Sequence, residues 1–107
     1  MEELDITKFG NITGSSLVKL HNSKKLFCNY CDNLKDNNLI KLMRRANNLE
    51  GLNIYACESI TIILINAAIE ITKNRSNNVM LDIQIRENQI DYKKIKEKSP
   101  LLHLEII

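Results

Sequence analysis

Residues 52–75, LNIYACESITIILINAAIEITKNR, decide the fold of this chain. Leu52, Ile54 and Ala56 alternate with the residues between them, which is the period of a strand with one buried face. Ser59 is the candidate N-cap that follows, because its hydroxyl can accept from backbone N–H groups that the first helical turn leaves free. The segment 60–71 is then apolar at helical spacing. The stretch therefore predicts a strand, a tight connection and a long helix.

The apolar residues of this helix cover more than one side of it. One set is Ile60, Ile63, Ala67 and Ile71, and the other is Ile62, Ile65 and Ile69. A helix that is apolar most of the way round is buried on most sides. Since one sheet face cannot cover it all in so short a chain, we expect a second chain to pack against it.

Length and composition set the class of protein. The 107 residues, with 44% hydrophobic and 26% charged side chains, are typical of one soluble globular domain. No apolar run approaches the roughly 18 residues of a membrane span, and the first residues lack a signal-peptide pattern. Three cysteines, an odd number, favour a reducing compartment over a disulfide framework. We therefore expect an intracellular protein with no membrane partner.

Working outward from the central stretch, four further segments are predicted to form elements, three by their periodic pattern and 26–31 by its aromatic residues, which favour strands. Strands are predicted at 26–31, 79–87 and 101–107, and a helix at 37–49 with Gly51 as its C-terminal stop. The predicted order is β-α-β-α-β-β, in which the last two strands form a long-armed hairpin. We expect an α/β fold with a single mixed four-stranded sheet and two helices on one face. Residues 1–21 are predicted to be an N-terminal extension and 22–107 the domain, and no internal repeat stands out.

A basic arm between the last two predicted strands is the strongest functional feature. It carries Lys93, Lys94, Lys96 and Lys98 within six residues. Lysines on a hairpin can neutralise phosphates along a nucleic-acid groove and release counterions, which requires no base contact. Asp91 and Glu97 dilute the charge, and the alternative interpretation is a solvated hairpin that is simply rich in lysine.

Other cations are weaker candidates for nucleic-acid contacts. Arg44 and Arg45 lie off the apolar stripe of the first helix, where a solvated helix face is the alternative. Lys24 and Lys25 lie close to the first predicted strand, and Arg86 is a candidate rim contact. The formal net charge is only +2, so any interaction with a polyanion depends on where these charges sit.

The cysteines and histidines do not predict a catalytic or metal site. Cys28 and Cys31 form a CxxC pair that Cys57 and a histidine could complete as a zinc site, but there is no second closely spaced ligand pair. In a strand, positions 28 and 31 would also point to opposite faces. We expect free thiols, no metal, no cofactor and no enzymatic constellation.

The element order with a basic arm resembles the Alba family of nucleic-acid-binding proteins, and the resemblance spans roughly residues 22–107. Two parts of the family's second helix have similar residues here. Its opening is similar to Ser59, Thr61 and Ile62, and its ending is similar to Glu70, Ile71, Lys73 and Asn74. The lysine-bearing segment at 22–25 and the closing strand LLHLEII also resemble the family.

The resemblance implies a homodimer, or a heterodimer with another Alba-like chain, that binds DNA, RNA or both without strong sequence specificity. Such binding would serve chromatin organisation or the control of mRNA and translation, so the resemblance implies a location in the nucleus, the cytoplasm or both. Two alternatives stay open: a protein subunit of an RNase P or RNase MRP type ribonucleoprotein, and an α/β module that binds a small molecule or a protein.

Overall fold

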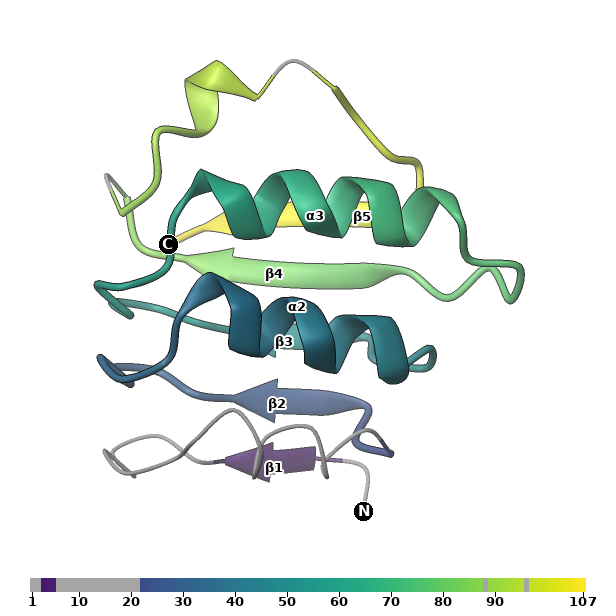
Figure 1. Cartoon of the computed structure of the whole chain (residues 1–107), viewed down its shortest axis with the longest axis horizontal. Coiled ribbons are helices and arrows are strands. Elements are labelled where there is room, and N and C mark those ends of the chain that lie inside the picture. The colour runs from purple at the N-terminus through teal and green to yellow at the C-terminus, as the bar shows by residue number, and fades with distance from the viewer. Residues whose placement is uncertain (1–2, 6–21, 88, 96) are drawn as a thin grey trace.

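The computed structural model describes residues 3–5, 22–87, 89–95 and 97–107. Its centre is a five-stranded sheet in which the strands lie side by side in the order of the sequence. The strands are β1 Glu3–Asp5, β2 Lys25–Phe27, β3 Gly51–Asn53, β4 Leu81–Ile85 and β5 Leu102–Ile106. Every neighbouring pair is parallel. Figure 1 shows the chain advancing one strand at a time from one edge of the sheet to the other.

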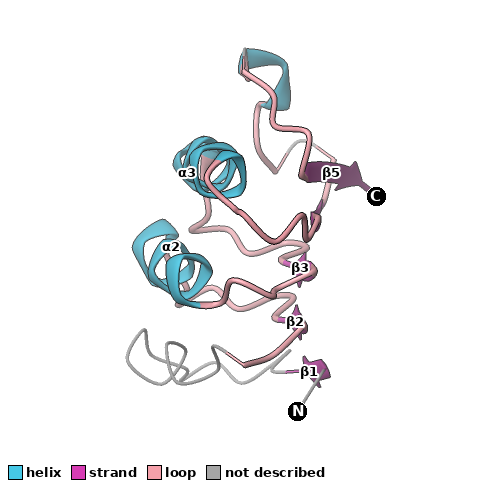
Figure 2. Ribbon diagram, turned by 90° about the vertical axis from the view of Figure 1, so that its right-hand side faces the viewer, coloured by secondary structure: helices cyan, strands magenta, loops and turns pink. Residues whose placement is uncertain are grey.

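The helices all lie on one side of this sheet. They are α2 Asp36–Arg45, between β2 and β3, and α3 Ile62–Lys73, between β3 and β4, with a short 3₁₀ helix, η1 Tyr92–Lys94, before β5. Figure 2 shows α2 and α3 stacked against one face while the described segments leave the opposite face bare. The predicted α/β class with two helices on one face is confirmed.

The predicted mixed sheet with a closing hairpin is wrong. β5 pairs parallel to β4, with Asp82 beside His103 and Gln84 beside Glu105. Parallel neighbours need a crossover of about a dozen residues or more, and the connection 86–101 is long enough to supply one. The segment predicted to be a hairpin arm is therefore a crossover, and β1 adds a fifth, edge strand within the range predicted to be an extension.

The structure contains an internal repeat that the sequence analysis missed. Lys25 pairs with Gly51, 26 positions later, and the same offset carries the start of α2 at Asp36 onto the start of α3 at Ile62. It also carries Tyr30 onto Ala56, and both adopt a left-handed backbone, with φ of 59° and 60°. The buried residues repeat in pairs: Leu26 and Leu52, Leu34 and Ile60, Leu39 and Ile65, Leu42 and Ala68, Met43 and Ile69, Ala46 and Thr72. Residues 25–50 and 51–76 are thus two successive coils of one design.

The start of α3 differs from the prediction and joins the two coils. The N-cap is Thr61, whose hydroxyl oxygen accepts from the N–H of Ile63 at 3.2 Å. Ser59 instead donates its hydroxyl to the carbonyl of Asp32 at 2.9 Å. The carboxylate of Asp36, at the first residue of α2, accepts from the backbone N–H and the hydroxyl of Thr61, at 2.8 and 2.6 Å. One side chain therefore links the beginnings of both helices.

Most of the apolar surface of α3 is covered within the chain. Leu64, Ile65, Ala68 and Ile69 are buried in the single core, whereas the side chain of Ile63 is 58% exposed. Packing against α2 and the sheet accounts for this burial without a second copy, and dimerisation stays a prediction. Among the described residues no helix has the length and apolar character needed to cross a membrane.

Candidate functional site

The bare side of the sheet presents two rows of side chains, which we call the open face. The alternation along each strand sends Leu26, Leu52 and Ile83 into the core beneath the helices, so their neighbours point the other way. The strand register lines these neighbours up across the sheet. The first row is Glu3, Lys25, Gly51, Asp82 and His103, and the second is Asp5, Phe27, Asn53, Gln84 and Glu105.

Polar contacts join side chains along both rows. In the second row, the amide of Asn53 donates to Gln84 Oε1 at 2.6 Å, and the amide of Gln84 donates to Glu105 Oε2 at 3.1 Å. The Oδ1 atom of Asn53 is buried and accepts no hydrogen bond from the described residues. In the first row, His103 Nδ1 lies 3.0 Å from Asp82 Oδ1. Three strands, β3, β4 and β5, thus hold an ordered polar surface rather than a set of independent side chains.

A hollow of about 140 Å³ interrupts the first row at Gly51. Glycine contributes no side chain there, so the space between Lys25 and Asp82 stays open. Phe27, Glu50, Asn53 and Gln84 also line it. A Cβ placed on Gly51 would lie 3.3 Å from Cγ of Lys25, so the aliphatic stem of that lysine forms one wall. The backbone of Gly51 does not need positive φ, which leaves the open space as the feature that the glycine provides.

One group on the open face has the composition of a metal site. The ligand atoms of Asp82, His103 and Glu105 all lie within 4.8 Å of one another. Asp82 and His103 already pair with each other, and Glu105 accepts from Gln84. The sequence does not reveal this group, because its members come from two strands whose register it does not predict.

The cations predicted to contact nucleic acid do not converge on one surface. Among those that the structure describes, Lys25 alone lies on the open face, where its Nζ is 3.9 Å from Glu3 Oε1. Arg44 and Arg45 lie in the last turn of α2, on the helix side. Arg86 follows β4 and pairs with Glu58 at 3.0 Å. Lys24 directly precedes β2. Three lysines of the predicted arm are exposed along the crossover, namely Lys93, Lys94 and Lys98, and Lys94 lies 3.7 Å from Asp91. Lys96 falls outside the described residues.

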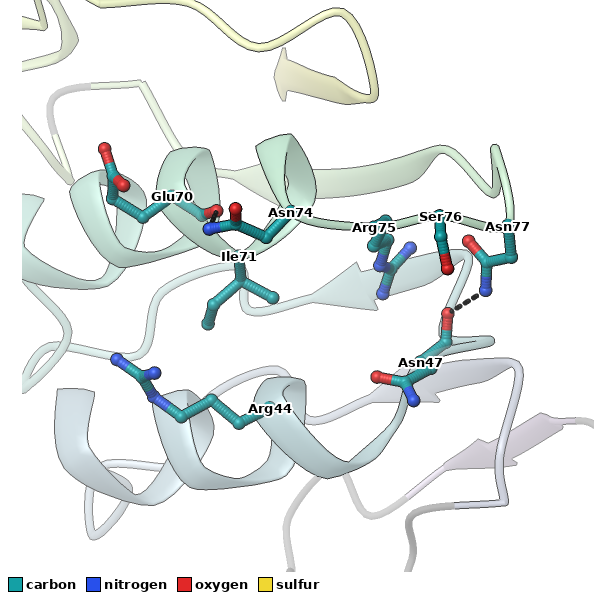
Figure 3. Close-up of a pocket in the computed structure, with 8 residues that line it drawn as sticks. All are labelled: Arg44, Asn47, Glu70, Ile71, Asn74, Arg75, Ser76 and Asn77. Atoms are coloured by element: carbon teal, nitrogen blue, oxygen red, sulfur yellow. Dashed lines mark hydrogen bonds between the residues drawn. The ribbon is translucent and has the colours of Figure 1, made fainter.

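A second hollow, of about 380 Å³, lies between the C-terminal ends of α2 and α3. Figure 3 shows its lining, with Asn77 hydrogen-bonded to the carbonyl of Asn47 at 2.8 Å. The guanidinium of Arg75 donates to the carbonyls of Leu49, Val79 and Ala46, at 3.0, 2.9 and 3.3 Å. Burial lowers the pKa of Arg75 from its ordinary value. This arginine therefore braces the chain after α2, and its role here is structural.

The three cysteines are buried thiols that form no disulfide with one another, as the sequence predicted. The thiol of Cys57 donates to the carbonyl of Cys28 at 2.8 Å. A side-chain hydrogen bond between Cys28 and Cys57, together with burial, raises the pKa of the Cys28 thiol well above the ordinary value. The strand predicted at 26–31 ends at Phe27, so the alternation expected for positions 28 and 31 does not apply. The left-handed Tyr30 turns the chain there, and both side chains are buried.

Comparison of the chain with protein-family models, with curated proteins and with solved structures finds no match in any of the three.

Proposed function

We propose that this chain is a β/α solenoid of the leucine-rich-repeat type whose open face binds another polypeptide. Solenoids of this kind place one strand per coil in a continuous parallel sheet. Their pattern, L-x-x-L-x-L-x-x-N/C-x-L, resembles Leu49-x-x-Leu52-x-Ile54-x-x-Cys57, and the next apolar residue, Ile60, comes one position later than the pattern places it. The coil before it repeats the spacing as Leu26-x-Cys28-x-x-Cys31 followed by Leu34. The 26-residue offset falls within the 20–29 residues typical of that repeat.

The observation that carries the proposal is an all-parallel sheet covered by helices on one side only. Parallel sheets are usually covered on both faces, because their crossover connections place helices there. Here every described crossover lies on the same side, which Figure 2 shows. Stacked repeats use such a continuous, uncovered surface to bind partners. The polar rows joined by hydrogen bonds fit a wet, specific protein contact.

Nucleic-acid binding is the second candidate, and the exposed Lys93, Lys94 and Lys98 favour it. Under it, the Alba-like role in chromatin or mRNA control and the RNase P or MRP subunit role both stay predictions. This function would use the crossover between β4 and β5. It needs no contact with the open face, so the two candidate functions predict different effects for the same variants.

The experiment is a selection of displayed peptides against the whole chain, followed by affinity measurements on two matched variants. Gln84→Arg places a long cation in the second row of the open face, and Asn66→Arg makes the same kind of change on an exposed position of α3. We expect Gln84→Arg to weaken the selected peptides at least tenfold while Asn66→Arg leaves them within twofold.

The opposite ranking would place the binding surface on the helix side and contradict the proposal. Duplex DNA forms the second arm of the experiment. If DNA binds and the alanine variant of Lys93, Lys94, Lys96 and Lys98 loses that binding while Gln84→Arg does not, the second candidate stands.

A further inference from the structure

The open face carries a charge opposite to that of the whole chain. Glu3, Asp5, Asp82 and Glu105 contribute four carboxylates to its two rows, and Glu50 adds a fifth at the rim of the hollow. Lys25 is the one lysine or arginine among the described residues of the two rows. The formal net charge of the chain is +2, so this surface is more acidic than the chain as a whole. Such a field attracts cationic segments and disfavours a polyanion.

The hollow over Gly51 has the size of a single side chain. Its volume is about 140 Å³, and a cavity of about 150 Å³ is enough to bind a benzene ring. It lies in the first row, midway across the sheet, between the strands of the two best-matched coils. A segment lying across the strands would therefore meet this hollow near the centre of its contact, where anchor residues usually insert.

The lining of the hollow favours a long side chain with a cationic end. The stem of Lys25 and the half-buried ring of Phe27 provide apolar walls. The carboxylates of Asp82 and Glu50 are acceptors, and the Oδ1 atom of Asn53 is a buried acceptor without a donor among the described residues. Arginine and lysine combine an apolar stem with a donor-only head, and an aromatic ring nearby adds cation–π attraction.

We infer that the partner of the open face is a basic polypeptide segment that anchors an arginine or lysine side chain in the hollow over Gly51. This inference rests on the proposed function and adds the chemistry of the partner and the place of its anchor. Asp82 and Glu50 hold the cationic head, and Lys25 and Phe27 flank the stem. Glu3, Asp5 and Glu105 extend the attraction to neighbouring basic residues of the segment.

The test uses three fluorescent dodecapeptides in which serine alternates with arginine, with citrulline or with glutamate. Citrulline keeps the shape of arginine without its charge. Binding to the whole chain is measured by anisotropy at two salt concentrations. We expect the arginine peptide to bind at least tenfold tighter than the citrulline peptide, the glutamate peptide not to bind, and the arginine peptide to weaken as salt rises.

Two variants place this binding in the hollow. Gly51→Val fills the space with a residue that strands favour, and it is expected to keep the melting temperature while weakening the arginine peptide at least tenfold. If Gly51→Val does not fold, Asp82→Asn with Glu50→Gln removes two rim charges without changing size and is expected to give the same loss. Glu70→Gln with Glu97→Gln is the control, since it removes the same charge from exposed positions outside the open face.

The outcomes separate this inference from the proposed function. If selected peptides depend on Gln84 but the arginine peptide is unaffected by the hollow variants, the basic partner is wrong and the open face remains a binding surface. If the arginine peptide binds and responds equally to the control pair, the attraction is general charge and the anchor is wrong. If no peptide depends on any open-face residue, both proposals fail.

Discussion

Replacing Leu52 by alanine is expected to lower the free energy of unfolding by about 2–5 kcal/mol, and Leu26→Ala by a similar amount. Both side chains are 1% exposed, they are register partners on β3 and β2, and they occupy the same place in two successive coils. Truncating either one leaves a cavity beneath the helices, where the packed neighbours cannot fully collapse. Urea denaturation of the two single variants measures the effect.

Ile63→Ala is the control for these two substitutions. It also shortens a branched aliphatic side chain, but one that is 58% exposed on α3, so its effect should stay within about 0.5 kcal/mol. A Leu52 variant as stable as the Ile63 variant would contradict the placement of β3 in the core. A large cost for Leu52 with none for Leu26 would contradict the equivalence of the two coils.

Arg75→Met is expected to cost about 1.5–3 kcal/mol, the range for hydrogen bonds that involve a charged group. Its guanidinium serves three backbone carbonyls, those of Ala46, Leu49 and Val79, which an unbranched thioether cannot do. Without the guanidinium, the backbone carbonyls between α2 and β3 lose their hydrogen-bond donor, and this connection becomes less stable. Thermal and urea unfolding of the variant measure it.

Arg44→Met provides the matched comparison from the same hollow. Arg44 is exposed, and no hydrogen bond to a described residue is seen for its side chain, so the change should stay within about 0.5 kcal/mol. Equal costs for the two variants would show that Arg75 contributes charge to the hollow rather than hydrogen bonds to the backbone.

The sequence predicted individual elements better than their assembly. The alternation of Leu81, Ile83 and Ile85 identified β4 because one face of that strand is buried and the other is not. The apolar stripe at 39, 42 and 43 identified α2 for the same reason. Periodicity reports which side of an element is buried, so it found both elements and left open which neighbours cover them.

Hydrophobic periodicity could not predict the direction of β5 or the internal repeat. A connection of the length of 86–101 fits a long hairpin as well as a crossover, and polar lysines occur in both. The repeat preserves burial rather than residue type, as Met43 with Ile69 and Ala46 with Thr72 show. The offset also changes, from 26 positions to 31 between Leu52 and Ile83 and to 21 between Ile83 and Leu104, so no fixed period recurs.

The candidate site depended on this missing assembly. Lysines and arginines are visible in the sequence, but strand order and register decide which of them meet. In the parallel, sequential sheet, Gly51 lies between Lys25 and Asp82, and the carboxylates of the open face lie in its two rows. Before that, the same residues are only the solvent-facing halves of separate strands.

Disulfide cross-linking between β4 and β5 tests the proposed solenoid most directly. Adjacent strands are about 4.8 Å apart, whereas diagonal neighbours lie about 7–8 Å apart, too far for an unstrained disulfide. Cysteines placed at 82 with 103, or at 84 with 105, should therefore cross-link on mild oxidation, because these positions are register partners. Cysteines at 82 with 105, or at 84 with 103, should stay reduced, and so should the buried native thiols of the unmodified chain. Cross-linking of the second two pairs and not the first would mean an antiparallel hairpin, which would contradict the sequential parallel sheet and the open face built on it.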